Sequence, residues 1–158
     1  MAILYTMKKL FTTILVLLVG SVVLYYLSQD VTPASSLFYV KRISENLILA
    51  TKISPQDRTD YYADLLDERL NELQELYDQK EYDLIISASL RYSTVAGRLT
   101  ETIKKHNLTD KSAKVKEQFS KHKQALQSMA DNYDEEDDRW KFIIDAKNYL
   151  DIYEKELP

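Results

Sequence analysis

The sequence predicts an all-α protein, in which a single N-terminal transmembrane helix precedes a roughly five-helix, mostly antiparallel bundle. The first observation is an uncharged apolar run from Leu10 to Leu27. The second is that 158 residues include only 2 glycines and 3 prolines, too few for the turns of most β architectures. The third is that long segments rich in leucine, alanine, glutamate, lysine and glutamine repeat apolar residues at helical spacing.

The apolar run has the length and the flanks of a membrane-spanning helix. At about 1.5 Å per residue, it just covers a hydrocarbon core about 30 Å thick, so the lipid bilayer is the expected partner of Leu10–Leu27. Lys8 and Lys9 mark the cytoplasmic side, and Tyr25 and Tyr26 suit the opposite interface. We therefore expect a cytoplasmic tail (1–9), a transmembrane anchor (10–27), a linker (28–36) and an extracytoplasmic helical domain (37–158).

A cleaved signal peptide is the alternative interpretation of the same run. Signal peptides usually have an apolar region of about 7–15 residues, followed by a cleavage site with the pattern small-x-small. Here the run is longer, and Thr32 and Pro33 make a poor site for cleavage after Ala34. The anchor is the favoured interpretation.

Composition excludes several classes of function. The chain carries a formal net charge of -4. Its first 27 residues contain two lysines and no acidic residue, so the body that follows them is more acidic than the chain as a whole. A nucleic-acid partner needs a basic face, so none is expected. The lack of cysteine excludes disulfides, thiolate metal sites and cysteine nucleophiles. With so little glycine, phosphate-binding loops and dinucleotide folds are not expected either.

The body is expected to contain five helices, over about residues 36–51, 55–77, 82–105, 109–133 and 135–157. The start of the second is the clearest, with Ser54 as N-cap, Pro55 in the first turn and Asp57 near the positive end of the helix. Thr109 or Asp110 is the expected cap of the fourth. Short loops between long helices predict that consecutive helices are antiparallel.

Apolar residues at helical spacing predict which face of each helix is buried. In the first helix these are Leu37, Val40, Ile43 or Leu47, and Ala50. The other stripes are Tyr62, Leu66, Leu70, Leu73 and Tyr77; Ile85, Ala88, Tyr92, Val95, Leu99 and Ile103, with Gly97 as the weak point; Val115, Phe119, His122, Leu126, Met129 and Tyr133; and Trp140, Ile143, Ala146, Leu150 and Tyr153.

Three short patches together carry a resemblance to a known family. The first is the run from Pro33 to Arg42, which is similar to an opening pattern P-x-S-x-L-Y-x-x-K-R. The second is Ser54-Pro55 followed by Glu68-Arg69-Leu70-x-Glu72, and the third is His122 four residues before Leu126. In this order and spacing, over about residues 33–130, they resemble the bacterial extracytoplasmic family known as domain of unknown function 5667.

The chain departs from that pattern in two places. Phe38 is inserted before Tyr39, and a turn at Gln79-Lys80-Glu81 replaces the glycine common before the third helix. The resemblance implies a bacterial envelope protein with one anchor and a helical body. It implies no activity.

Two groups of side chains suggest metal binding, and for each a structural interpretation is preferred. The acidic run Asp134 to Asp138 could ligate calcium, but contiguous acids at the start of the last helix are explained by the helix dipole. His106 and His122 lack the spacing of a metal site, and His122 lies in an apolar stripe, which predicts a partly buried, hydrogen-bonded histidine. We expect no metal and no cofactor.

The carboxylates of the second helix raise a further possibility. Glu68, Glu72 and Glu75 are similar to the ladders of di-iron bundles, but the Glu-x-x-His motifs of those sites are missing. A solvated face is the preferred interpretation. No residue is predicted to be catalytic.

Tyrosines give the best indication of an interaction surface. Tyr61, Tyr77, Tyr82 and Tyr149 are the candidates, because tyrosine is enriched at protein interfaces. Tyrosine is also common at the margins of helical cores, which is the favoured alternative.

The sequence therefore predicts a membrane-anchored extracytoplasmic module that binds or scaffolds an unidentified protein at the bacterial cell envelope, and that is not an enzyme. The alternative is an extracytoplasmic ligand-sensing domain. It would signal through a partner protein, because the short cytoplasmic tail holds no output domain.

Overall fold

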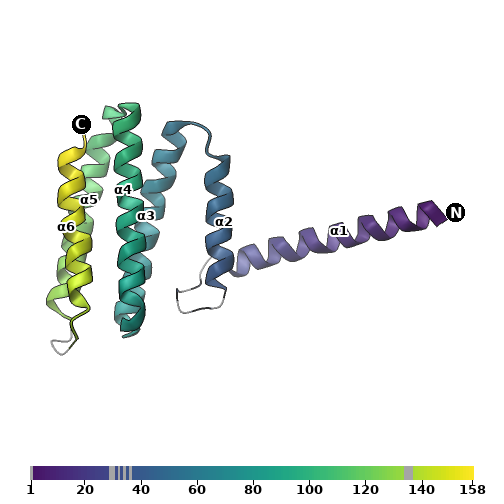
Figure 1. The fold of residues 1–158 in the computed structure, drawn as a ribbon, viewed down its shortest axis with the longest axis horizontal. Coiled ribbons are helices and arrows are strands. Elements are labelled where there is room, and N and C mark those ends of the chain that lie inside the picture. The colour runs from purple at the N-terminus through teal and green to yellow at the C-terminus, as the bar shows by residue number, and fades with distance from the viewer. Residues whose placement is uncertain (1, 29–30, 32, 34, 36, 134–136) are drawn as a thin grey trace. The chain divides into compact units, whose positions relative to one another are not determined.

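A computed structural model describes residues 2–28, 31, 33, 35, 37–133 and 137–158, and of residues 2–6, 8 and 9 the backbone alone. None of the described residues lies in a β-strand, so the prediction of an all-α fold with an N-terminal apolar helix and a helical bundle is confirmed (Figure 1). The helices are α1 (Ala2–Leu27), α2 (Phe38–Thr51), α3 (Pro55–Asp78), α4 (Ile85–His106), α5 (Thr109–Asp131) and α6 (Trp140–Glu156), with a short 3-10 helix, η1 (Tyr82–Leu84), before α4.

The chain divides into two compact units, Met1–Leu47 and Ile48–Pro158. In the first unit, α1 contains the apolar segment Leu10–Leu27, none of which is buried. By length and composition, this helix fits a membrane span or a signal sequence. The side chains of Lys8 and Lys9, on which the predicted orientation depends, lie outside the described residues.

Helix α2 forms where it was predicted, but only part of its predicted inner face is covered. Of the residues expected to face inward, Leu37 and Val40 are partly buried, whereas Ile43, Leu47 and Ala50 are exposed. The buried residues of α2 are Phe38 and Glu45. The covered side of α2 carries charge, since Arg42 donates to Glu45 over 2.9 Å. The spacing of apolar residues shows which of them share a face of a helix, but it does not show which face is covered.

The second unit contains α3 to α6, packed side by side (Figure 1). Helix α4 packs against both α3 and α6, and α5 packs mainly against α6. Consecutive helices run in opposite directions, so α4 and α6 are parallel. Lys104 of α4 accordingly pairs with Glu156 of α6, over 2.7 Å, at the same end of both helices.

Every residue of the stripes predicted for α4 and α5 is buried, although Tyr133 lies beyond the end of α5. The stripe of α6 is buried at its centre, and in that of α3 Leu66 and Leu73 are buried while Leu70 is partly buried. Each of these stripes places its apolar residues against the neighbouring helices, which makes one core. The residues of this core with no exposed surface are Leu66, Leu73 and Leu76 on α3, Ile85, Tyr92, Ala96, Leu99 and Ile103 on α4, Phe119 and Leu126 on α5, and Ile143 and Leu150 on α6.

The capping prediction holds for α3 and fails for α5. The Ser54 hydroxyl accepts the Asp57 amide at 3.0 Å, and Pro55 follows in the first turn. At α5 the cap position is Leu108, which has no capping side chain, and Thr109 is already helical. Leu108 is buried, so apolar packing holds this helix start in place of a polar cap.

Gly97 is a point of close packing between α4 and α6. A methyl group at its Cα would lie 3.0 Å from the Tyr153 hydroxyl and 3.2 Å from the ring carbon that bears it. Such distances are shorter than ordinary van der Waals contact, so a side chain here would displace Tyr153. The glycine that weakens α4 as an isolated helix thus allows the Tyr153 ring to pack against it.

Leu126 tests this core. It has no exposed surface, so Leu126→Ala should lower the free energy of unfolding by about 2–5 kcal/mol. The matched control is Leu90→Ala, because Leu90 is 59% exposed and its truncation should change stability by about 0.5 kcal/mol or less. Urea unfolding of the full chain in detergent, followed by circular dichroism, measures both. Equal losses for the two variants would contradict the packing of α5.

Candidate functional site

A polar pocket lies between α3 and α5 in the second unit. It has a volume of about 260 Å³ and is open to solvent. Helix α3 contributes two aspartates to one wall, and α5 contributes a mixed set of charged and polar side chains to the other. The lining residues are Ala63, Asp64 and Asp67 on α3 and Lys114, Glu117, Gln118, Lys121 and His122 on α5.

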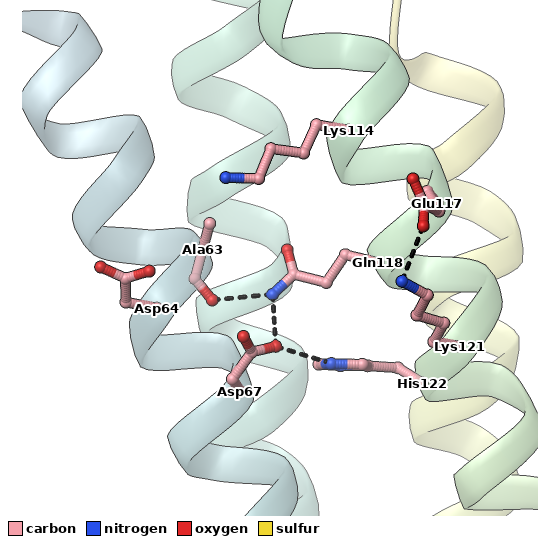
Figure 2. A pocket seen from close by; sticks show the side chains of 8 residues that line it. All are labelled: Ala63, Asp64, Asp67, Lys114, Glu117, Gln118, Lys121 and His122. Atoms are coloured by element: carbon pink, nitrogen blue, oxygen red, sulfur yellow. Dashed lines mark hydrogen bonds and ion pairs between the residues drawn. The ribbon is translucent and has the colours of Figure 1, made fainter.

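Asp67 is the centre of the hydrogen bonds in this pocket. One carboxylate oxygen accepts from His122 Nε2 at 2.8 Å and from the Gln118 amide at 2.5 Å. The same amide nitrogen donates to the carbonyl of Ala63 at 2.9 Å (Figure 2). Gln118 and His122 lie four residues apart on α5, so both side chains face α3.

Tyr92 of α4 lies behind His122, inside the core. Its hydroxyl is 3.0 Å from His122 Nδ1, and both side chains are buried. The arrangement suits the neutral imidazole in which Nε2–H donates to Asp67 and Nδ1 accepts from the tyrosine hydroxyl. A chain of hydrogen bonds therefore links α3, α5 and α4.

Burial determines how these groups titrate. It lowers the pKa of His122, and the charge and hydrogen bond of Asp67 oppose this shift without reversing it. Burial, together with the charge of Asp67, also raises the pKa of Tyr92 well above its usual value. Both groups are therefore neutral at neutral pH.

Two charged side chains of the pocket are left without a described partner. Lys121 pairs with Glu117 at 2.6 Å, and Asp67 is occupied as described above. Among the described residues, Lys114 on one wall and Asp64 on the other have neither a hydrogen bond nor an ion pair, and both are exposed. The pocket thus offers one positive and one negative charge to solvent, each on a different helix.

The predicted acidic run falls partly outside the described residues, because residues 134–136 are not described. Asp137 and Asp138 precede α6, which begins at Trp140, so the prediction that they form its first turn is wrong. Asp137 instead accepts from the backbone and the side chain of Arg139, and Asp138 pairs with Lys141 at 2.8 Å. The described part of the chain holds no group of three or more histidine, aspartate or glutamate residues that could bind a metal ion.

The predicted solvated face of α3 is wrong at one position. Glu68 and Glu75 are exposed, but Glu72 is 4% exposed and accepts from Arg69, itself 1% exposed, over 2.6 Å. A buried carboxylate needs a partner of opposite charge, and the spacing of three residues along α3 supplies it. Both residues belong to the sequence pattern that suggested the family.

The four tyrosines proposed as an interaction surface lie in three places. Tyr77 and Tyr82 both pack on Tyr133, with ring centroids at 5.8 Å and 4.5 Å. Tyr61 lies beside Tyr62 on α3, at 6.1 Å, and Tyr149 stacks on Tyr153 of α6 at 5.9 Å. Tyr149 is 45% exposed, and the other three are partly buried.

Sequence reasoning predicted a partly buried, hydrogen-bonded His122, and the structure confirms the hydrogen bonds and buries the side chain. It missed the partners, Asp67 and Tyr92, which come from different helices. The position of Gln118 one turn before His122 is the signal that could have indicated a polar patch on α5.

Comparison with known proteins gives a family match. The model of the family described as Domain of unknown function (DUF5667) matches residues 30–136. No curated protein and no solved structure matches the chain.

The titration of His122 gives a testable pH dependence. Because folding lowers its pKa, the unfolded chain takes up a proton first as the pH falls. Neutral His122 should make its full contribution to the free energy of unfolding above the unfolded pKa of about 6.5, and this contribution should decrease as the pH falls from there toward the folded pKa. The free energy of unfolding should therefore be lower at about pH 5 than at about pH 7.5. In His122→Gln, the part of this decrease that comes from His122 should be lost.

His106→Gln is the matched control, because His106 is exposed at the end of α4. It should retain the pH dependence of the unmodified chain in urea unfolding. An unchanged dependence in His122→Gln would show that His122 does not titrate as the buried geometry requires.

Proposed function

We propose that this chain, which belongs to the family known as domain of unknown function 5667 (DUF5667), is a membrane-anchored module that binds a protein partner at the extracytoplasmic face of a bacterial membrane, without catalysis. One observation carries this proposal. The second unit is a well-packed helical body that nevertheless exposes large apolar side chains on α4 and α6, two helices that pack against each other. They are Ile86 (37% exposed) and Leu90 (59%) on α4, and Tyr149 (45%) and Ile152 (51%) on α6.

These side chains have the character of an interface. Exposed apolar residues on neighbouring elements mark a binding surface more often than isolated ones do. Tyr149 belongs to the residue type most enriched at interfaces, and its stacking on Tyr153 reduces the conformational entropy that it would lose on binding.

The pocket supports a role other than catalysis. A histidine acting as general base needs a ring nitrogen within reach of the proton of a substrate. Here Nε2 is bonded to Asp67 and Nδ1 to Tyr92, so both nitrogens of His122 are engaged within the protein. The neutral, buried His122 therefore contributes to the packing of the core and to the alignment of α3, α4 and α5 with one another.

Photocrosslinking tests the binding surface. A photoreactive amino acid replacing Leu90 or Tyr149 in the full chain should capture a protein in native membranes, because both side chains are exposed on the proposed surface. The matched control is the same replacement at Ala113, which is exposed on α5. Capture from Leu90 or Tyr149 should be lost when Ile152 is also changed to Asp. Equal capture from Ala113 would show that α4 and α6 are not the binding surface.

Topology tests the anchor. The lysines at positions 8 and 9 should remain cytoplasmic and residues 28–158 should lie outside, as the positive charge before Leu10 requires. Protease added to intact spheroplasts should digest the body, with a cytoplasmic protein as the control for lysis. Protection of the body would reverse the topology, and release of a soluble form that begins near Ser35 would identify a cleaved signal peptide.

Ligand sensing is a second candidate function, and the pocket favours it. Lys114 and Asp64 face solvent from opposite walls of a cavity of about 260 Å³, without a described partner. A small zwitterion, such as a free α-amino acid, carries the two charges that this pair would complement. Binding would link α3 to α5 and so could change the exposed surface of the body.

A thermal-shift experiment tests this candidate. Alanine and lysine at millimolar concentration should raise the melting temperature of the full chain in detergent, because a ligand of the folded state stabilises it. The shift should be lost in Lys114→Ala and kept in Lys105→Ala, whose side chain is exposed at the end of α4. A shift that persists in Lys114→Ala would place binding elsewhere.

A further inference from the structure

Helix α2 presents an apolar face to the outside. Tyr39 is 78% exposed, Ile43 61% and Leu47 65%, and their spacing of four residues places them on one side of the helix. All residues of α2 are described, and every exposed one is uncharged. Its charged residues, Lys41, Arg42 and Glu45, are partly or wholly buried.

This pattern is the reverse of that of a helix on the surface of a soluble protein. Such a helix turns its apolar stripe inward and its charges to water. On α2, Glu45 is buried and Lys41 is partly buried, while Arg42, which pairs with Glu45 at 2.9 Å, keeps 37% of its side chain exposed. The outer face of α2, formed by exposed apolar side chains, therefore suits an apolar environment.

A second copy of the chain could cover the apolar face of α2, but this face is too small to form a stable dimer interface by itself. A helix of 14 residues is about 21 Å long, and one face of it buries a few hundred Å², at roughly 10 Å width. A stable interface buries about 800 Å² on each partner. A dimer made through this face alone would therefore be weak.

A lipid surface does not have this limitation. If α1 spans the membrane, the link of residues 28–37 can extend at most about 35 Å, so α2 begins within that distance of the bilayer. The anchor supplies a high effective concentration, so a small apolar face is sufficient. Tyr39, at the start of the stripe, is of a residue type enriched at the membrane interface.

We infer that the face of α2 formed by Tyr39, Ile43 and Leu47 lies in the headgroup region of the bilayer, so that α2 is an interfacial helix between the anchor and the body. The inference rests on the proposed membrane anchoring. The apolar side chains of this face enter the boundary between headgroups and acyl chains, while Glu45 remains buried and Arg42 stays paired with it. The helix thereby limits how far the body can move from the membrane.

Fluorescence quenching in lipid nanodiscs tests the position of this face. The chain lacks cysteine, so a single introduced cysteine can carry an environment-sensitive fluorophore. The full chain is labelled at Ile43→Cys or Leu47→Cys. Val19→Cys in the apolar run is the lipid reference, and Lys105→Cys at the exposed end of α4 is the aqueous reference. The quenchers are a nitroxide-labelled lipid and aqueous iodide.

The expected result is quenching by the nitroxide lipid at positions 43 and 47 that exceeds quenching at 105 several-fold, with little quenching by iodide. Quenching by iodide equal to that at 105, with lipid quenching kept at 19, would overturn the inference and leave the anchor standing. Protection at 43 and 47 from both quenchers would identify a protein cover, such as a second copy, and would also overturn it. Loss of lipid quenching at 19 would reject the anchoring itself, and the inference with it.

Discussion

The burial of α4 between α3 and α6 is the constraint on which the second unit depends. Its stripe from Ile85 to Ile103 is buried from one end to the other. Gly97 allows Tyr153 of α6 to pack closely against α4, which lies beside α6 and parallel to it. Helix α5 then completes the core mainly through α6, which leaves a narrower contact with α3 and the polar pocket beside it.

Polar groups inside this core connect the pocket to the packing. Tyr92 contributes from the most buried helix, His122 from α5 and Asp67 from α3, so one chain of hydrogen bonds joins three helices. Buried polar groups are costly when unpaired, and a satisfied chain of them favours one arrangement of the helices over others. The shape of the pocket therefore depends on how α3, α4 and α5 are aligned with one another. A ligand that bound in the pocket would act on this alignment.

The two units divide the work of the proposed function. In that proposal the first unit, which contains the apolar helix and most of α2, would attach the chain to the membrane. The second is a self-contained helical body, and its exposed apolar residues, such as Leu90 and Tyr149, would form the surface for a partner. A body held near the membrane by both an anchor and an interfacial helix would meet membrane partners in a restricted orientation, which favours association with weak individual contacts.

The sequence alone determined the features that depend on local spacing. The apolar segment Leu10–Leu27, the cap at Ser54 and the buried stripes of α3 to α6 could be predicted because neighbours along a helix decide them. Burial of His122 could be predicted in the same way, from its place in an apolar stripe.

Only the tertiary structure decided the features that depend on which helices meet. It placed Asp67 and Tyr92 on either side of His122, separated the four candidate tyrosines, and buried Glu72 beside Arg69. It also turned Ile43 and Leu47 of α2 outward, although their pattern is that of a buried face. Periodicity specifies that two residues share a side of a helix, whereas the neighbour on that side, whether another helix, water or lipid, is set by contacts between segments distant in sequence.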